Sequence, residues 1–207
     1  GQDRCGVDGN GAVVLAQQIA GSPGLRFDGL MGYEGHIVAE RDYETRKTEA
    51  EKSMAILLGA ADQIRAADIE VKVVSASGTG TYSITGRVDG VTELQCGSYI
   101  FMDGDYVDVF DDFAPALSVL ATVVSRQRED MAVADLGLKS ISIDRGFADV
   151  LSPAGATIIG HSEEHTKIEL SGEAARALAV RGRAAAGESK RALEVQALLD
   201  AALRSDH

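Results

Sequence analysis

The chain has few cysteines, no cluster of basic residues ahead of its C-terminal tail and no long apolar run. Its net charge of −12 argues against binding to nucleic acid or to an anionic membrane. Without a signal peptide or a long apolar run, nothing in the sequence indicates export or membrane insertion. We therefore expect a cytoplasmic protein that binds neither nucleic acid nor a membrane.

The two cysteines, Cys5 and Cys96, form no C-x-x-C pattern. In a cytoplasmic protein we expect such a pair to be two buried free thiols rather than a disulfide. An initiator methionine is also absent, which predicts a fragment of a longer protein. With 207 residues, 45% of them hydrophobic, the chain is long enough to bury a core as one large domain, or as a domain plus a smaller piece.

The first half of the chain alternates between helical and strand patterns. Apolar residues at helical spacing predict helices over residues 10–20 and 42–67, and apolar runs predict strands over Leu25–Tyr33, Val71–Ser75 and Thr92–Tyr99. Strands that alternate with helices pair in parallel through right-handed crossovers. This order predicts part of a (β/α)8 TIM barrel, whose ligands gather at the carboxyl ends of the strands.

The second half is rich in β patterns and ends in a different composition. Short alternating runs predict strands over residues 116–125, 131–135, 138–143, 156–159 and 166–170. The tail is rich in alanine and arginine, and its apolar spacing predicts a helix over residues 192–204. The expected fold class is thus α/β, with the barrel part in residues 1–112, a β domain in residues 113–172 and a helical tail in residues 173–207.

Two glycine turns follow the last two predicted barrel strands. The first is Ser77-Gly78-Thr79-Gly80, and the second contains Gly97 and Ser98. Small residues leave backbone N–H groups uncovered, and nearby hydroxyl groups add donors, so such turns suit a phosphate. Turns of this kind are also common as purely structural elements. From spacing alone, a shared phosphate site and two structural turns are both open.

Several segments together resemble a known enzyme family. They are Gly1–Val7, Gly32–His36, the first glycine turn and Glu93–Asp103, with support from Ala134–Ser140 and Ser162–His165. In combination they are similar to the D-threonine aldolase and D-serine dehydratase family, whose enzymes use pyridoxal 5'-phosphate (PLP) and share their barrel with alanine racemase. The resemblance extends to about Ala179, and the tail beyond it is unlike the family.

The resemblance implies a role for each matching residue and a homodimeric full-length enzyme. Arg4 would face the phenolic oxygen of PLP, Tyr33 would lie against its ring, and Gln95 would stand near the ring nitrogen, where alanine racemases carry an arginine. The residues of the two glycine turns would form the phosphate cup: Ser77, Gly78, Thr79, Gly80, Gly97 and Ser98. The alternative is a surface arginine for Arg4 and core packing for Tyr33. For His36 a structural role is expected.

Two parts of the family's chemistry are not found in this sequence. The Schiff-base lysine of the family lies upstream of the position that matches Gly1, so the catalytic residue is unknown here, and Lys139 is not assigned to that role. The family's divalent-metal motif, a histidine followed closely by cysteine or aspartate, is also missing, so no metal ligand is assigned. Glu164 and His165 could approach a metal or substrate, but a surface polar pair is the simpler interpretation.

These observations predict part of a PLP-dependent lyase that acts on D-3-hydroxy amino acids, either an aldolase or an ammonia-lyase. The alternatives are a non-catalytic remnant, or a barrel isomerase or aldolase that binds another phosphorylated ligand. Because the lysine and the metal motif are missing, the isolated chain is expected to be inactive.

Overall fold

The computed structural model describes residues 2, 4–102, 104–172, 174, 178 and 193–196. It divides the chain into two compact units. Unit 1 consists of Gly1–Tyr99 with Asp108–Phe110, and unit 2 of Ile100–Val107 with Asp111–His207. Each unit has its own core and is described by itself.

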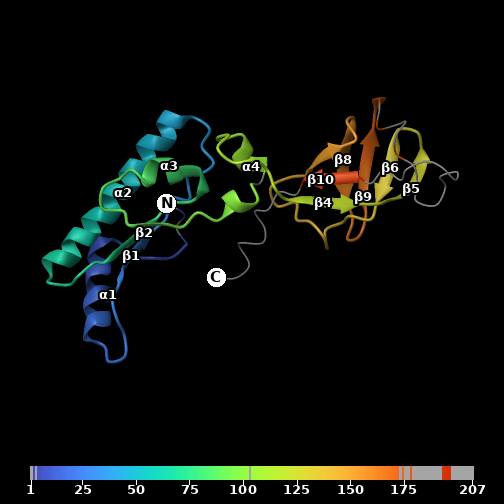
Figure 1. Ribbon diagram of the computed structural model, residues 1–207. Helices are drawn as coiled ribbons and strands as arrows, with labels where there is room; N and C mark the ends of the chain where they lie inside the picture. The colour runs from blue at the N-terminus through green and yellow to red at the C-terminus, as the bar shows by residue number, and fades with distance from the viewer. Residues whose placement is uncertain are drawn as a thin grey trace. The chain divides into compact units, whose positions relative to one another are not determined.

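Unit 1 is built on a parallel sheet of three strands in the order β1-β2-β3. Figure 1 labels β1 and β2. The strands are β1 (Gly29–Gly32), β2 (Val73–Ala76) and β3 (Glu93–Leu94). Gly29 pairs with Val73 and Ser75 with Glu93, in both cases in parallel. The predicted adjacency and direction of the three strands are confirmed, although each strand is shorter than its apolar run suggested.

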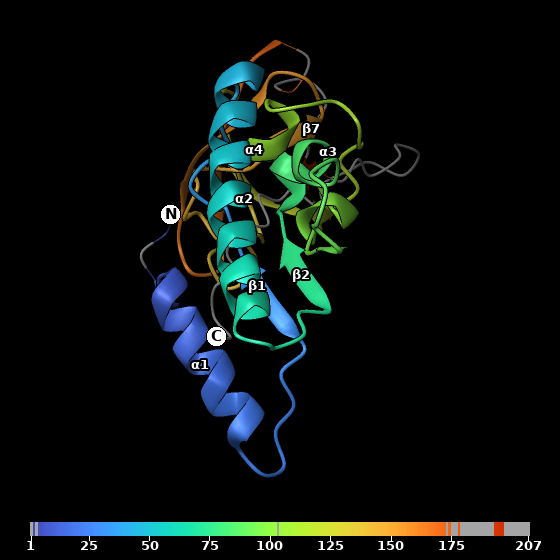
Figure 2. The ribbon, with the colours of Figure 1, turned by 90° about the vertical axis from the view of Figure 1, so that its left-hand side faces the viewer.

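Two long helices contribute to the core of unit 1: α2 (Tyr43–Ala66) packs on the sheet, and α1 (Gly9–Gly21) packs on α2. Both are close to the predicted bounds. Asp42 caps α2 by accepting a hydrogen bond from the Thr45 N–H, which satisfies a donor that has no partner within the helix. Figure 2 shows α2 lying along β1 and β2. The buried side chains of the cluster formed by α1, α2 and β2 are small or branched, among them Ala16, Ala61, Ile64 and Val74.

Short helical segments follow the second and third strands instead of longer strands. After β2 a 3-10 turn, η1 (Thr79–Thr81), runs directly into α3 (Tyr82–Thr85). After β3 the segment η2 (Ser98–Ile100) forms another 3-10 turn. The strand expected to reach Tyr99 therefore ends at Leu94, and both glycine turns lie just past the carboxyl ends of their strands.

Unit 2 contains the short helix α4 (Gly104–Val107) and two antiparallel sheets. One sheet has the order β4-β10-β7, and the other β5-β6-β9-β8. Their cores are filled by alternate residues of the strands, among them Ala132, Ala134, Ile158 and Ile168. The strand bounds are β4 (Ser118–Ala121), β5 (Val123–Arg128), β6 (Met131–Ala134), β7 (Asp149–Ser152), β8 (Ala156–His161), β9 (Thr166–Leu170) and β10 (Leu193–Gln196).

Two predictions for this region are wrong. Residues 138–143 form turns rather than a strand: Ile141 is buried, and the Ser140 and Ile141 N–H groups donate to the Gly137 carbonyl. Within the predicted helix over residues 192–204, Leu193–Gln196 form strand β10 between β4 and β7. Pairing on both sides of β10 outweighs the helical preference of its residues. The rest of that prediction lies outside the described residues.

Among the helices that the structure describes, none combines the length and the apolar character needed to cross a bilayer.

Candidate functional site

The two glycine turns meet at the same end of the parallel sheet. The Tyr99 N–H donates a hydrogen bond to Thr79 Oγ1 at 3.1 Å, and the Cys96 thiol contacts the Gly78 carbonyl oxygen at 3.5 Å. The Gln95 N–H donates to the Ala76 carbonyl at 2.9 Å, which continues the pairing of β2 and β3 up to the turns. Segments about 20 residues apart in the sequence are therefore joined directly.

The first turn is buried and closely packed. A Cβ atom on Gly80 would collide with the carbonyl oxygen of Val38, and one on Gly78 would lie 2.8 Å from Tyr33 Cε2. Ser77 has a φ of +76°, a left-handed backbone conformation that non-glycine residues rarely adopt. The glycines of this turn are thus explained by close contact with the loop that follows β1, whether or not a ligand binds.

A buried carboxylate lies behind this turn. Glu34, in the loop after β1, is 1% exposed. It accepts hydrogen bonds from the Ser77 N–H at 3.2 Å, the Thr81 hydroxyl at 2.7 Å and the Thr85 hydroxyl at 2.5 Å. Glu34 is not among the site residues predicted from the sequence. The sequence offered one signal for this contact: an acidic residue follows the first strand, and several hydroxyl-bearing residues follow the second.

The second turn is more open than the first. A Cβ atom on Gly97 would meet no atom within 4 Å, and Ser98 is half-buried. Cys96 precedes these residues and is half-buried against the first turn. Burial raises the pKa of the Cys96 thiol above its ordinary value, while a hydrogen bond with Ser77 acts in the opposite direction. Both cysteines are free, as predicted, but the expected burial is wrong, because Cys5 is exposed and Cys96 is only half-buried.

Tyr33 and Arg4 lie together beside the first turn. The guanidinium carbon of Arg4 is 6.0 Å from the centroid of the Tyr33 ring. Gly35 and Gly78 leave room for this ring, because a Cβ atom on either residue would overlap it. Gln95 is exposed one residue beyond β3. The predicted residues on the first three strands thus gather at one end of the sheet, and His36 is exposed in the loop after β1.

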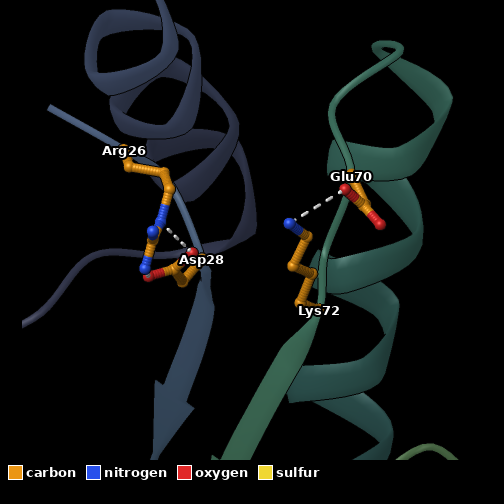
Figure 3. A network of polar contacts seen from close by, with 4 residues as sticks. All are labelled: Arg26, Asp28, Glu70 and Lys72. Atoms are coloured by element: carbon orange, nitrogen blue, oxygen red, sulfur yellow. Dashed lines mark hydrogen bonds and ion pairs between the residues drawn. The ribbon is translucent and has the colours of Figure 1, made fainter.

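The described lysines are partly or largely exposed, and most form ion pairs on the surface. Lys47 pairs with Glu51 and Lys52 with Glu49, both on α2. Lys72 pairs with Glu70 at 3.5 Å just before β2, at the amino end of the strand and opposite the turns (Figure 3). In unit 2, Lys139 pairs with Glu164 at 2.7 Å, and Lys167 is exposed on β9.

The residues of this site suit one kind of ligand and not another. The residues of the turns fit a phosphate: open space borders Gly97, and Thr79 and Gly80 begin a helical segment whose first N–H groups have no earlier helical carbonyl to bond. The described residues do not fit a metal, because they contain no group of three or more His, Cys, Asp or Glu side chains arranged around one ion. Glu164 is paired with Lys139, and His165 is exposed.

Two family models match adjoining parts of the sequence. The model of the alanine racemase N-terminal domain matches residues 1–105, and that of a serine dehydratase domain matches residues 116–186. The second match includes the first part of the tail.

Characterised proteins with similar sequences include two aldolases that act on D-amino acids. A 3-hydroxy-D-aspartate aldolase from Paracoccus denitrificans (strain Pd 1222) is 35% identical over 179 residues, which are 82% of this chain and 46% of that protein. A D-threonine aldolase from an Arthrobacter species is 36% identical over 170 residues, or 80% and 45% of the two chains. This chain spans about half the length of the curated relatives that it matches.

A solved structure with a similar fold is the D-threonine aldolase from Filomicrobium marinum. Its TM-score is 0.83 at 30% identity, and the match covers 95% of this chain and 52% of that one. The fold of both units is therefore one already known in this group of proteins.

Proposed function

The chain belongs to the alanine racemase-like family, in the group of the D-threonine aldolases, and we propose that it supplies the phosphate end of the cofactor site in a PLP-dependent lyase acting on D-3-hydroxy amino acids. The alanine racemase-like family is PLP-dependent. The observation that carries the proposal is the junction of the two glycine turns, at which the Tyr99 N–H donates to Thr79 Oγ1. This junction joins the second turn, in which Gly97 borders open space, to the start of the helical segment at Thr79.

Each residue of the site has a distinct part in this proposal. The phosphate is assigned to the N–H groups of Gly97 and Ser98, in the more open second turn, together with those of Thr79 and Gly80, which have no earlier helical carbonyl to bond. Tyr33 packs against the cofactor ring, and its own position is fixed by the backbone of Gly35 and Gly78. Arg4, which lies over the Tyr33 ring, donates to the phenolic oxygen.

Gln95 would stand near the ring nitrogen, where alanine racemases carry an arginine. A neutral amide there would oppose protonation of that nitrogen less than the positive charge of an arginine does. When bound, PLP supplies an electron sink for bond cleavage next to the α-carbon of an amino acid. Together these residues orient the cofactor and keep its phosphate in place. The group that holds PLP covalently is not assigned, since the described lysines are on the surface.

A direct test of the phosphate site uses pyridoxine 5'-phosphate, which lacks the aldehyde that would react with exposed lysines. We expect it to bind the chain more tightly than pyridoxine does, measured by calorimetric titration. Equal affinities for the two compounds would contradict the proposed phosphate site.

The lyase part of the proposal is tested separately. After incubation with PLP and borohydride reduction, mass spectrometry of the chain is expected to show no single lysine modified stoichiometrically. A version that carries the corresponding amino-terminal part and the carboxyl-terminal metal motif of an aldolase relative, which supply the lysine and the metal ligands, is expected to cleave D-threonine to glycine and acetaldehyde. Release of ammonia and a 2-oxo acid instead would identify a dehydratase. Turnover by the unextended chain would show that a lysine of this chain takes the catalytic role.

A further inference from the structure

We propose that Glu34 is a positioning residue that holds the first glycine turn in its phosphate-binding conformation. The inference rests on the proposed function, because it concerns the same phosphate site. It starts from the burial of this carboxylate, which is 1% exposed. Burying an unpaired carboxylate is costly, so a charged group in such a place needs donors around it.

The donors around Glu34 come from two successive parts of the chain after β2. Its Oε2 accepts from the backbone N–H of Ser77, and its Oε1 accepts from the hydroxyl groups of Thr81 and Thr85. The hydrogen bond from Ser77 holds the start of the turn, and the bonds from the two threonines hold the helical segment that follows it. Hydrogen bonds to an ionised acceptor are stronger than those between neutral groups. One side chain therefore fixes both ends of the turn.

The conformation held in this way is one that the turn would not readily keep alone. Ser77 has a φ of +76°, which is unfavourable for a residue with a side chain. Its N–H bond to Glu34 compensates for that conformation, since no other hydrogen-bond acceptor is found for this N–H among the described contacts. The direction of the backbone at Ser77 sets where Gly78, Thr79 and Gly80 lie. Glu34 thereby acts on the phosphate donors without touching the phosphate.

Glu34→Gln is the sharpest substitution because it keeps the shape of the side chain. It replaces one acceptor oxygen by an NH2 donor, which must then face either the Ser77 N–H or the threonine hydroxyls. Glu70→Gln is the matched control, since Glu70 is an exposed residue at the opposite end of the sheet whose partner is Lys72. Thr85→Val removes one donor to Glu34, and Thr85→Ser restores it.

The readout is the ratio of affinities for pyridoxine 5'-phosphate and pyridoxine, measured for the full chain by calorimetric titration. A loss of packing alone would lower the affinities for both compounds equally and leave their ratio unchanged. We expect Glu34→Gln to lower the ratio about tenfold, the loss of a charged hydrogen bond. Thr85→Val is expected to lower it less, and Glu70→Gln and Thr85→Ser are expected to leave it unchanged.

The outcomes separate the two proposals. A wild-type ratio above one that Glu34→Gln does not change would overturn the role of Glu34 and leave the phosphate site standing. A wild-type ratio of one would overturn the phosphate site itself, and the positioning role with it. If Glu34→Gln does not fold, the Thr85 pair decides: an equal ratio in Thr85→Val and Thr85→Ser overturns the role of Glu34.

Discussion

The two glycine turns have similar compositions but different surroundings. In the first, Gly78 and Gly80 are buried, and a Cβ atom on either would overlap Tyr33 or Val38. In the second, Gly97 is exposed and has no atom near the position of an added Cβ. The same residue type thus serves close packing in one turn and backbone access in the other. Glycine content alone does not identify the part of a cup that touches a ligand.

The largest expected effect follows from the packing of the first turn. Gly80→Ala would place a methyl group against the Val38 carbonyl, and a backbone atom cannot move aside as a flexible side chain can. We expect a loss of about 3 kcal/mol in the free energy of unfolding of unit 1. Urea unfolding followed by circular dichroism measures it. An unchanged midpoint would show that the first turn is not closely packed.

The matching substitution in the second turn is expected to act on binding alone. Gly97→Ala meets open space, so the free energy of unfolding should change by less than about 0.5 kcal/mol. The added methyl group narrows the approach to the neighbouring N–H groups, and affinity for pyridoxine 5'-phosphate should fall about tenfold. Calorimetric titration and urea unfolding of the same variant measure both quantities. A destabilised variant with normal affinity would reverse the contrast between the turns.

A smaller effect reports how firmly the two turns are joined. Burial raises the pKa of the Cys96 thiol, and only the thiolate reacts with iodoacetamide. In the folded chain, the rate of Cys96 alkylation should therefore begin to rise at a higher pH than it does for an ordinary cysteine thiol. In urea, where burial is lost, the rise should move to lower pH. Peptide mass spectrometry at a series of pH values separates Cys96 from the exposed Cys5. Equal pH profiles in the two states would mean that Cys96 is not held against the first turn.

The sequence predicted the frame of unit 1 well because its signals are local. The apolar spacing of α2 and its Asp42 cap are both visible in the sequence, and the parallel order follows from the alternation of helices and strands. In unit 2, residues 138–143 have a strand-like pattern. Of the apolar residues in this segment only Ile141 is buried, whereas Leu138 and Ile143 are exposed. Strand β10 was missed because its partners β4 and β7 lie far away in the sequence.

The candidate site was predictable in its glycines and hydroxyls but not in its support. The positions of the two turns follow from the ends of β2 and β3. The role of Glu34 does not, since its three donors lie 43 to 51 residues further along the chain. Nor does the sequence tell which glycine is packed and which is open. That distinction depends on Val38 and Tyr33, which belong to a different loop.

The charged residues before β1 and β2 have a practical consequence for handling the protein. Arg26 pairs with Asp28, and Lys72 with Glu70, in exposed positions at the amino ends of the two strands (Figure 3). Exposed pairs of this kind contribute little to the stability of a fold, because water and salt screen the charges. A four-residue strand separates them from the turns by roughly 13 Å at about 3.3 Å per residue. A fluorophore or an immobilisation tether attached at Glu70 would therefore report on ligand capture without obstructing it.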